Sequence, residues 1–459
     1  MKRVLIANRG EIAARIARAC QKLDVEAVLA CADSDDNAAL ASMVDRVVRV
    51  GAAPATQSYL DQDAVITAAI GTGCDAIHPG YGFLSERASF RRLCDEAGVT
   101  FIGPDAQAMA TMGDKLAALK LARSHDVPTI PGCERLDTGR DAAREAARVG
   151  LPVILKASAG GGGRGMRVVR ELPEMESAFD AASAEARAAF GDGTLFMEKY
   201  IERARHIEVQ IFGDAHGNVV HLGERDCSVQ RRHQKLIEES PSPVADEALR
   251  SALAAAAVRL AKAASYVGAG TVEFVLDLSS GAFYFLEMNT RIQVEHPITE
   301  EITGIDLVAE QIRVAAGESL SFSQSDVTFR GHAIECRINA EDVDNGFAPC
   351  PGTILEWRPP DAPGVRVDSH CYPGYIVPPF YDSMIGKLIV HGRDRAEAIE
   401  RMLAALDAFG VAGVHTTLPF SRAIIADTDF QQSAITTAWL ETVFLPRYLE
   451  LHVSRVRTE

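Results

Sequence analysis

Residues Gly270–Pro297 read GTVEFVLDLSSGAFYFLEMNTRIQVEHP, and this stretch is the most informative of the chain. Two runs rich in β-branched and aromatic residues, Thr271–Leu276 and Ala282–Met288, are separated by the turn-forming residues Ser279-Ser280-Gly281. Such a pattern predicts a β-hairpin, because serine and glycine favour the tight turn that antiparallel strands need. The stretch therefore predicts an antiparallel strand pair near the middle of the chain.

Two glutamates of this hairpin predict a metal site. If the turn centres on Ser280, Glu273 faces Glu287 across the strands. Two like charges on an otherwise apolar hairpin are destabilising unless a cation lies between them. Carboxylate oxygens are the ligands that Mg²⁺ prefers. The alternative is a pair of surface glutamates on a solvated face.

Polar residues continue beyond the hairpin with a period of two, at Glu287, Asn289, Arg291, Gln293 and Glu295. In an extended backbone these side chains line one face. Arg291 offers a bidentate fork for a small planar oxyanion, and Glu295 is placed to take a proton from it. The stripe predicts an anion pocket that ends in a base, with a simple exposed strand edge as the alternative.

A glycine-rich run, Gly160–Gly165, lies upstream of the hairpin. It matches GxGxxG formally, but strand-like residues flank it on both sides, Pro152–Ser158 before and Met166–Val169 after. A dinucleotide fingerprint needs a helix after the glycines, and a P-loop needs lysine where Met166 stands. The run therefore predicts the tip of a β-hairpin, and it is interpreted as a mobile lid whose N–H groups approach phosphate. A merely flexible turn is the alternative.

The two ends of the chain show different patterns. Apolar strands such as Val4–Ala7 and Ala27–Cys31 alternate with helical segments, such as one beginning near Glu11, and this alternation predicts a parallel sheet covered by helices. After about Arg330, strand-like segments are separated by Pro and Gly clusters and followed by a helix over 395–409. This end is predicted to be β-rich.

Composition excludes several classes of protein. The chain has 459 residues, 47% of them hydrophobic and 24% charged, which predicts a globular protein of several domains. A net charge of -16 without a basic tail argues against nucleic-acid binding. The apolar run at Val4–Ala7 is too short for a signal peptide, and the Ala-rich segment 248–264 carries charges that predict an amphipathic helix rather than a membrane span. The 9 cysteines form no CxxC motif, which argues against a disulfide framework or zinc site and for a cytoplasmic protein.

A basic cluster, Gln230–Lys235, stands out in this acidic chain. A charge run is usually a solvated face. Beside a predicted oxyanion site, the cluster is interpreted as a source of cations for the pocket.

Taken in order, these motifs resemble the biotin carboxylases of the ATP-grasp superfamily over nearly the whole chain. The matching segments are Ile6–Ala13, His78–Glu86, the glycine run, Gln230–Lys235, Glu287–His296, Ile334–Glu341 and Tyr381–Met384. The resemblance implies an α/β fold with three parts. These are a Rossmann-like parallel-sheet domain over 1–113, an ATP-grasp α+β domain over 114–317 with a glycine-rich lid over 131–203, and a β-rich C-terminal domain over 330–446.

The resemblance also implies roles for single residues. ATP is expected to contact Lys115, Lys156, Gly161, Gly162, Gly163, Glu198, Lys199, Ile201, His206, Gln230, His233, Glu273 and Glu287. Mg²⁺ or Mn²⁺ is expected at Glu273, Glu287 and Asn289. Bicarbonate is expected at Lys235, Arg291, Gln293, the Val294 backbone and Glu295, and biotin at Tyr81, His233 and Arg337. The implied catalytic residues are Glu295, Arg337, Arg291 and Lys235.

The implied activity is ATP- and bicarbonate-dependent carboxylation of biotin through carboxyphosphate. The chain has no Met-Lys-Met site for attaching biotin, so biotin is expected on a separate biotin carboxyl carrier protein. A separate carboxyltransferase, acting on acetyl-CoA or another acyl-CoA, is expected to consume the product. A homodimer without nucleic-acid or membrane partners is also expected from the family.

Two other functions are the alternatives. Another ATP-grasp enzyme, such as a carboxylate–amine ligase, shares the nucleotide and metal residues but has no need of Tyr81, Arg337 or the stripe from Arg291 to Glu295. A catalytically silent nucleotide-binding subunit of a carboxylase complex is expected to have lost Glu295, Arg337 or Lys235, and all three are present.

Overall fold

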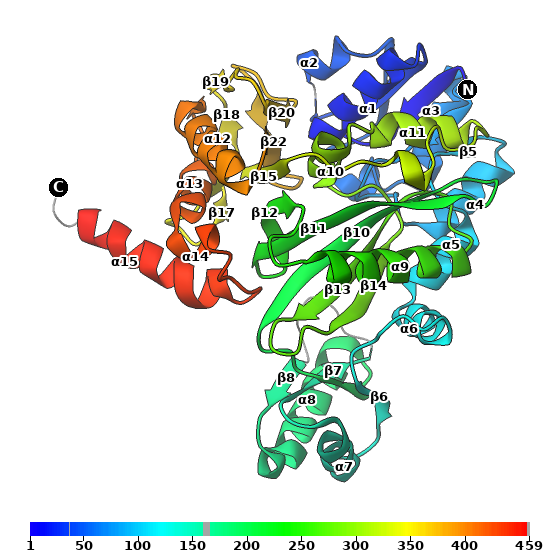
Figure 1. The fold of residues 1–459 in the computed structure, drawn as a ribbon. Coiled ribbons are helices and arrows are strands. Elements are labelled where there is room, and N and C mark those ends of the chain that lie inside the picture. Colours follow the sequence, from blue (N-terminus) through cyan, green and yellow to red (C-terminus); the bar gives the residue numbers. More distant parts are fainter. Residues whose placement is uncertain (36, 159–165, 457–459) are drawn as a thin grey trace. The chain divides into compact units, whose positions relative to one another are not determined.

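The computed structural model describes residues 1–35, 37–158 and 166–456, and its chain forms two compact units. Figure 1 traces the elements of both. Unit 1 consists of Met1–Leu121, Arg205–Phe274 and Glu287–Glu459, and unit 2 of Ala122–Ala204 and Val275–Leu286. In the described residues, no helix has both the length and the apolar character needed to cross a membrane.

The N-terminal part of unit 1 is a five-stranded sheet in the order β3-β2-β1-β4-β5, and every neighbouring pair is parallel. Its strands are β1 (Arg3–Ile6), β2 (Glu26–Ala32), β3 (Arg46–Gly51), β4 (Ala76–His78) and β5 (Thr100–Phe101). The helices of this part are α1 (Gly10–Lys22), α2 (Ala38–Ala41), α3 (Gln62–Thr72), α4 (Ala88–Glu96) and α5 (Ala106–Gly113), with a short η1 (Ala55–Gln57). Val4, Leu5 and Ile6 are completely buried, as expected for a strand covered on both faces. The predicted parallel sheet is confirmed.

An eight-stranded sheet in the order β14-β13-β10-β11-β12-β15-β22-β20 carries most of the predicted site. Its strands are β10 (Ala204–Gly213), β11 (Val219–Arg231), β12 (Gln234–Ser240), β13 (Gly268–Asp277), β14 (Phe283–Asn289), β15 (His332–Asn339), β20 (Val365–Ser369) and β22 (Met384–Gly392). The predicted hairpin is confirmed as β13 and β14, with the Asp277 N–H donating to the Ala282 carbonyl at 2.8 Å. Three C-terminal strands, β15, β22 and β20, continue the same sheet.

Helices pack on this sheet and join it to the N-terminal part of unit 1. They are α9 (Glu247–Ala263), α10 (His296–Thr303) and α11 (Leu307–Ala315), with η3 (Gln324–Asp326). α9 packs on β11, α10 on β15, and α11 on α1. Phe212, Ile292 and Leu307 share one hydrophobic core with Val4 and Ile6, so apolar burial links the two sheets of unit 1.

The C-terminal part of unit 1 completes the fold with short strand pairs and helices. The strands are β16 (Glu341–Asp342), β17 (Ala348–Pro349), β18 (Gly352–Thr353), β19 (Glu356–Arg358), β21 (Ile376–Val377) and β23 (Gly410–Ala412). The helices are α12 (Arg395–Ala408), α13 (Leu418–Ala426), α14 (Thr428–Gln431), the π-helical η4 (Leu440–Phe444) and α15 (Leu445–Val456). The predicted helix over 395–409 is confirmed as α12.

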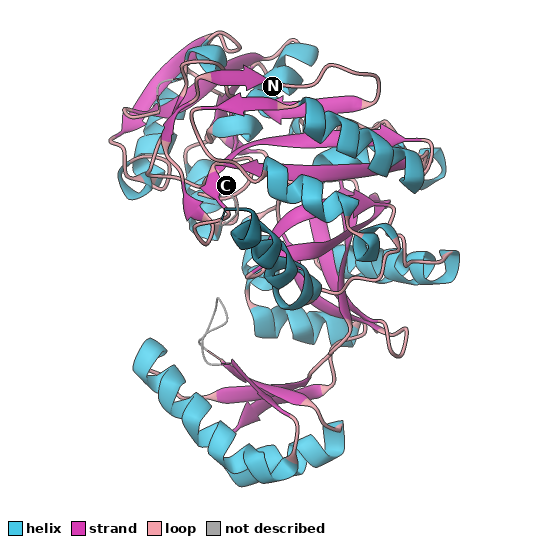
Figure 2. Cartoon of the chain, turned by 90° about the vertical axis from the view of Figure 1, so that its left-hand side faces the viewer, coloured by secondary structure: helices cyan, strands magenta, loops and turns pink. Residues whose placement is uncertain are grey.

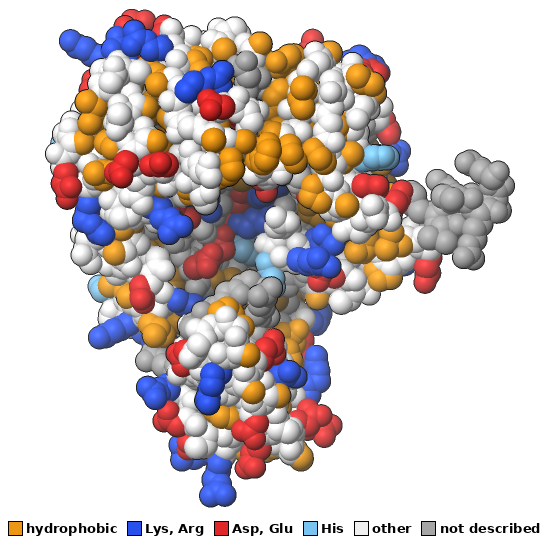
Figure 3. All heavy atoms as spheres, turned by 180° about the vertical axis from the view of Figure 1, so that it is seen from behind, with side chains coloured by type: hydrophobic (Ala, Val, Ile, Leu, Met, Phe, Trp, Pro, Cys, Tyr) orange, Lys and Arg blue, Asp and Glu red, His pale blue; other side chains and the backbone are white. Residues whose placement is uncertain are grey.

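On the face drawn in Figure 3, acidic and basic side chains are interspersed with a band of hydrophobic ones.

Unit 2 is built on a four-stranded sheet in the order β6-β9-β7-β8. Its elements are β6 (Gly132–Leu136), α7 (Gly139–Val149), β7 (Val153–Ala157), β8 (Met166–Val169), η2 (Leu172–Glu174), α8 (Met175–Phe190) and β9 (Leu195–Lys199). α6 (Lys115–Ser124) leads into it from unit 1. The two long helices, α7 and α8, pack together on one side of the sheet, as Figure 2 shows.

The strands on either side of the glycine run are antiparallel partners, with Val153 opposite Val169 and Lys156 opposite Met166. This pairing confirms that the glycines connect two strands of a hairpin and do not lead into a helix. The glycines themselves, including Gly161, Gly162 and Gly163, lie outside the described residues.

Candidate active site

A strained turn presents the basic cluster Gln230–Lys235. β11 and β12 pair up to the residues on each side of Arg232 and His233, so these two residues form the turn. Their φ angles are +47° and +64°, the left-handed conformation that the favoured two-residue hairpins require. This conformation costs residues other than glycine about 1 kcal/mol each. The Glu441 carboxylate in η4 accepts the Arg232 N–H at 2.7 Å, which helps to hold the turn.

Lys235, two residues beyond the turn, is surrounded by three carboxylates. Its Nζ donates to Oε2 of Glu208 at 2.5 Å, to Oε1 of Glu273 at 2.9 Å and to Oε1 of Glu295 at 2.7 Å. The lysine side chain is 11% exposed and none of the carboxylates exceeds 8%. Burial lowers the pKa of Lys235, but the three carboxylates raise it well above its ordinary value. The ammonium is therefore charged and fixed in place.

Glu295 bridges two cations. Its Oε1 accepts from Lys235, and its Oε2 accepts from Nη2 of Arg337 at 3.0 Å. Nε of Arg337, on β15, donates to Oε1 of Glu238 at 2.6 Å. Burial raises the pKa of Glu295, but Lys235, together with Arg337, outweighs burial and lowers it. Three predicted catalytic residues therefore form one hydrogen-bonded chain in which the carboxylate is ionised.

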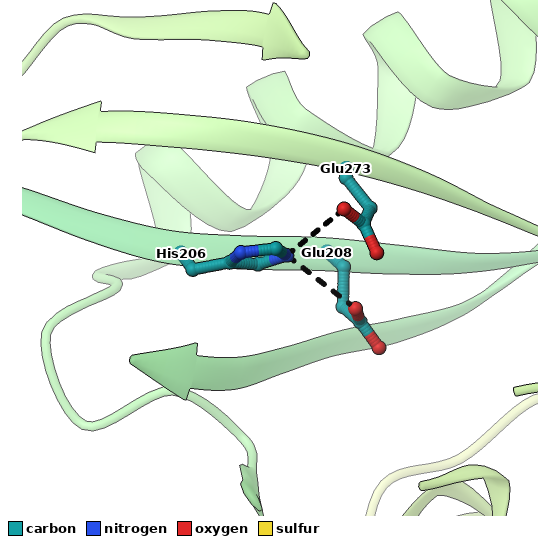
Figure 4. A group of neighbouring side chains, drawn as sticks. All are labelled: His206, Glu208 and Glu273. Carbon is teal, nitrogen blue, oxygen red and sulfur yellow. Dashed lines mark ion pairs between the residues drawn. The ribbon is translucent and has the colours of Figure 1, made fainter. Parts of the chain in front are cut away.

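A histidine adds a second cation to the carboxylate group around Lys235. Nε2 of His206 lies 3.3 Å from Oε2 of Glu273 and 3.7 Å from Oε2 of Glu208. Figure 4 shows the histidine ring directed at both carboxylates. Burial lowers the pKa of His206, but the Glu273 and Glu208 carboxylates together outweigh burial, and the pKa is raised to about 9. His206 is therefore protonated near neutral pH and, like Lys235, faces an anionic group.

Arg225 supports this arrangement from β11. Its Nε donates to Oε1 of Glu208 at 2.5 Å, and its other nitrogens donate to Gln210, Thr271 and Thr299 at 2.7–3.1 Å. The side chain is completely buried. These buried hydrogen bonds hold the Arg225 guanidinium in place, and Arg225 in turn holds the Glu208 carboxylate. Glu208 then accepts the hydrogen bond from Lys235.

The polar stripe is not the extended strand that its period of two predicts. β14 ends at Asn289, residues 290–295 form neither strand nor helix, and α10 begins at His296 with Glu295 as its N-cap. One reason is Glu86, whose Oε1 accepts the Thr290 N–H at 3.0 Å while its Oε2 accepts from Nε of Arg291 at 3.0 Å. The expectation of one extended face beyond Asn289 is therefore wrong.

The turn nevertheless brings the side chains of the stripe together. Asn289 and Gln293 donate to Oε1 of Glu273 at 3.0 and 3.2 Å. Nη1 of Arg291 donates to Oε1 of Gln293 at 3.1 Å. The loop after Asn289 thus folds back and brings residues predicted to bind bicarbonate close to the carboxylates around Lys235.

The residues predicted for the metal offer a suitable set of oxygen donors. Partial burial and the nearby Glu273 carboxylate both raise the pKa of Glu287, while His206 and Lys115 lower it. The two carboxylates are therefore close enough to repel each other, and a divalent cation relieves such repulsion. Carboxylate oxygens with the amide of Asn289 beside them fit a hard cation such as Mg²⁺.

The residues predicted for biotin have different surroundings. The hydroxyl of Tyr81 donates to Oε1 of Glu11, and both burial and this carboxylate raise the pKa of Tyr81. His233 is exposed in the strained turn. Arg337 is 15% exposed and faces the two acids Glu238 and Glu295.

The remaining nucleotide residues are divided between the units. Lys156, Glu198, Lys199 and Ile201 belong to unit 2, and Lys115, His206, Gln230 and His233 to unit 1. On adjacent strands of unit 2, the ammonium of Lys156 pairs with Glu198. The ammonium of Lys199 donates to the carbonyls of Gly150 and Leu151 at 3.0 and 2.7 Å. In unit 1, Gln230 is buried on β11 and Lys115 is exposed at the start of α6.

Sequence reasoning missed four charged residues of the site: Glu86, Glu208, Arg225 and Glu238. For Glu208 a signal existed, because polar His206, Glu208 and Gln210 alternate with apolar residues as on a half-polar strand. Arg225 and Glu238 carry no such signal. Arg225 lies opposite Glu208 on the neighbouring strand β10. The partner of Glu238 is Arg337, 99 residues away on β15, and only the pairing of β12 with β15 brings those two together.

Comparison with known proteins shows matches along almost the whole chain. Family profiles match residues 1–109 (biotin carboxylase, N-terminal domain), 114–323 (carbamoyl-phosphate synthase L chain, ATP binding domain) and 335–442 (biotin carboxylase C-terminal domain). The chain is 51% identical to a biotin carboxylase of Nostoc sp., covering 96% of this chain and 98% of the relative. It is also 49% identical to biotin carboxylase 1 of Bacillus subtilis, again covering 96% of this chain and 98% of the relative.

A solved structure agrees with these sequence matches. The biotin carboxylase domain dimer of the 2-oxoglutarate carboxylase of Hydrogenobacter thermophilus, in complex with MgADP, ADP and bicarbonate, superposes with a TM-score of 0.87. It is 47% identical, and the match covers 96% of this chain and 97% of that one.

Proposed function

This chain belongs to the biotin carboxylase family, and we propose that it uses ATP and bicarbonate to carboxylate biotin carried on a separate protein. One observation carries the proposal: Glu295 accepts hydrogen bonds from both Lys235 and Arg337. A base is thereby held between a cation suited to bicarbonate and a cation suited to the ureido oxygen of biotin. One site can then serve both halves of the reaction.

In the first half, Glu295 takes the proton of bicarbonate, and the resulting carbonate oxygen attacks the γ-phosphorus of ATP. Carboxyphosphate forms as the bond to ADP breaks. Lys235 and Arg291 hold the anion, and Lys235 lowers the pKa of bound bicarbonate by the same charge that lowers the pKa of Glu295. As expected for phosphoryl transfer, the protein contributes mainly alignment and charge.

In the second half, carboxyphosphate breaks down to CO₂ and phosphate. The phosphate takes the N1 proton of biotin, Arg337 stabilises the negative charge that develops on the ureido oxygen, and N1 attacks CO₂. Tyr81 and His233 line the biotin side. Exclusion of water favours transfer over hydrolysis of the intermediate.

Glu273 and Glu287, with Asn289, would hold Mg²⁺. Bound there, the ion would neutralise charge on the phosphates of ATP. Lys115 and His206 would add positive charge beside the phosphates. Lys156 and the segment Glu198–Ile201 would also bind the nucleotide. The relative with bound MgADP and bicarbonate supports this choice of ligands.

The partners follow from the half-reaction. We propose that a biotin carboxyl carrier protein delivers biotin and that a carboxyltransferase passes the carboxyl group to acetyl-CoA or another acyl-CoA, in the cytoplasm. The likeness to a biotin carboxylase along 98% of that relative supports a separate carrier. The dimer of the Hydrogenobacter domain supports a homodimer.

Substitution of Glu295 by glutamine tests the first half. Loss of the base is expected to reduce bicarbonate-dependent ADP release at least about 100-fold, the usual contribution of a general base, while ATP still binds. Glu318→Gln, an exposed glutamate of unit 1, serves as the matched control. Undiminished ADP release in Glu295→Gln would remove this residue from the mechanism.

Substitution of Arg337 by lysine separates the proposal from another ATP-grasp ligase. The shorter, unforked cation is expected to reduce carboxylation of free biotin more than bicarbonate-dependent ATP cleavage. Equal losses would contradict a biotin-specific role. In the unsubstituted enzyme, ADP release that does not change when free biotin is added would favour a different ligase activity.

A further inference from the structure

We infer that His296 and Lys387 are positioning residues, which hold the carbonyl groups on the two sides of Val294 and so direct its backbone N–H toward bicarbonate. The inference rests on the proposed function, in which Val294 binds bicarbonate through its backbone. Neither residue had a predicted role. The contacts that support it lie entirely within unit 1.

The peptide group before Val294 is held by His296. Nδ1 of His296 lies 2.8 Å from the Gln293 carbonyl oxygen, and the His296 backbone N–H reaches the same oxygen at 3.3 Å. A carbonyl only accepts, so Nδ1 carries the proton. Because a trans peptide is planar, its N–H points opposite to its C=O. Fixing the Gln293 oxygen therefore fixes the direction of the Val294 N–H.

The peptide group after Val294 is held by Lys387. Nζ of this lysine, on β22, donates to the Val294 carbonyl at 2.7 Å. The Lys387 side chain is completely buried, and its long chain leads from the large sheet to the loop. With both neighbouring peptide planes held, Val294 keeps its backbone direction in a segment that lacks regular secondary structure.

The charge state of each group suits this role. Burial, followed by Lys387, lowers the pKa of His296 well below its ordinary value, so the ring is neutral. Lys387 has counter-charges, since its Nζ lies 3.2 Å from Oε1 of Glu11 and Asp368 is its partner on β20. Glu11 in turn accepts the hydroxyl of Tyr81. One buried cation thus connects the bicarbonate loop with a residue predicted to bind biotin.

A charge-neutral double substitution tests Lys387 without leaving a buried charge unpaired, because Asp368 keeps its ion pair with Arg366 at 2.7 Å. In Lys387→Met/Glu11→Gln both members of the pair lose their charge, which such pairs tolerate better than loss of one partner. We expect the KM for bicarbonate to rise by about tenfold or more, because the Val294 N–H would no longer be held toward the anion. Loss of one hydrogen bond to a charged group has an effect of this size. The KM for ATP is expected to stay within about twofold, because a lost ground-state contact acts on its own ligand.

A pair of His296 substitutions gives a second test. Asparagine places an amide N–H near the position of Nδ1, whereas leucine has no donor. His296→Leu is therefore expected to raise the KM for bicarbonate, and His296→Asn to restore it toward the original value. A purely structural role predicts no such rescue. Glu335→Gln is the matched control, because Glu335 lies in the same buried cluster but makes no bond to the loop.

The outcomes separate the inference from the proposed function. If the unsubstituted enzyme shows no bicarbonate-dependent ADP release, the proposed function fails and the inference with it. If it does show this activity, an unchanged bicarbonate KM in the double variant and in His296→Leu overturns the inference alone. Equal rises in the KM values for ATP and bicarbonate would also overturn it, since they indicate general damage.

Discussion

Lys235 in unit 1 and Lys156 in unit 2 are both predicted to bind substrate anions, but their surroundings differ. The Lys235 side chain is 11% exposed and contacts three carboxylates that are at most 8% exposed. The Lys156 side chain is 20% exposed and pairs with Glu198, which is 10% exposed. Lys235 is therefore part of a buried network, and Lys156 belongs to a simple pair on adjacent strands.

This contrast indicates that a residue predicted to bind substrate can also support folding. Removing one member of a buried network leaves the other charges without compensation inside the protein, which is costly. Removing one member of a single pair leaves one charge without compensation, whereas removing Lys235 leaves three. Substitutions in the network should therefore affect stability and activity together, and substitutions in the pair mainly ligand binding.

The largest effect is expected for Lys235→Met. Glu208, Glu273 and Glu295 would then crowd together without their shared cation, and the free energy of unfolding should fall by about 3–5 kcal/mol. Lys156→Met leaves only Glu198 without its cation, so it should lower the free energy of unfolding by less while weakening ATP binding. Urea unfolding followed by circular dichroism measures both, and equal destabilisation by the two variants would remove the contrast between the units.

A smaller effect that depends on pH is expected for Glu335→Gln. Burial raises the pKa of Glu335 well above its ordinary value, and neither carboxyl oxygen has a hydrogen-bond partner among the described residues. The folded protein therefore keeps a proton that the unfolded chain releases above about pH 4.5. Stability is lost as pH rises from there toward the folded pKa, by at most about 1.4 kcal/mol per pH unit.

Glutamine does not titrate, so the variant should gain stability relative to the unsubstituted protein as pH rises. Thermal unfolding at pH 5 and pH 7 measures this gain. A difference in Tm that is constant between the two pH values would mean that Glu335 is ionised in the folded protein.

A still smaller gain is expected from Arg232→Asn at the strained turn of unit 1. Asparagine tolerates a left-handed conformation better than arginine does, so stability should rise by about 0.5 kcal/mol. Arg232→Ala keeps the backbone strain and is the control. The shift in the urea midpoint decides between them, and equal shifts would show that φ at this position is not the cause.

The smallest effect is expected in unit 2 for Arg170→Ala. Arg170 pairs with Glu202, and both side chains are more than half exposed. Water and salt screen such a pair, so the unfolding midpoint should not change measurably at physiological ionic strength. A clear fall in the unfolding midpoint would show that surface ion pairs stabilise unit 2, as the buried network is expected to stabilise unit 1.

Much of the fold follows from local patterns. The alternation of strands and helices predicts the parallel sheet of β1 to β5, and the turn residues Ser279–Gly281 predict the hairpin of β13 and β14. Strand-like residues on both sides of the glycine run predict the pairing of β7 with β8. These features are local because neighbouring segments of chain make the contacts that stabilise them.

The site was predicted less completely. A period of two at Glu287 to Glu295 predicts an extended strand. In the structure the Glu86 carboxylate, from a distant segment, accepts the Thr290 N–H, and the chain turns at this point. The alternation of polar residues at His206, Glu208 and Gln210 was a local signal for Glu208. Arg225 and Glu238 were missed because their roles depend on which strands become neighbours. No local pattern reports that, since β12 and β15 are nearly a hundred residues apart in sequence yet pair directly.

Local sequence patterns were enough to specify the class of the fold, the two hairpins and the set of residue types that anion and phosphate chemistry needs. Only long-range packing established which charges share a cation, how the loop after Asn289 turns, and why Lys387 reaches Val294. The physical reason is the distance along the chain over which each effect acts. Periodicity and turn propensity act over a few residues, whereas the energy of a buried charge depends on every group that packing places around it.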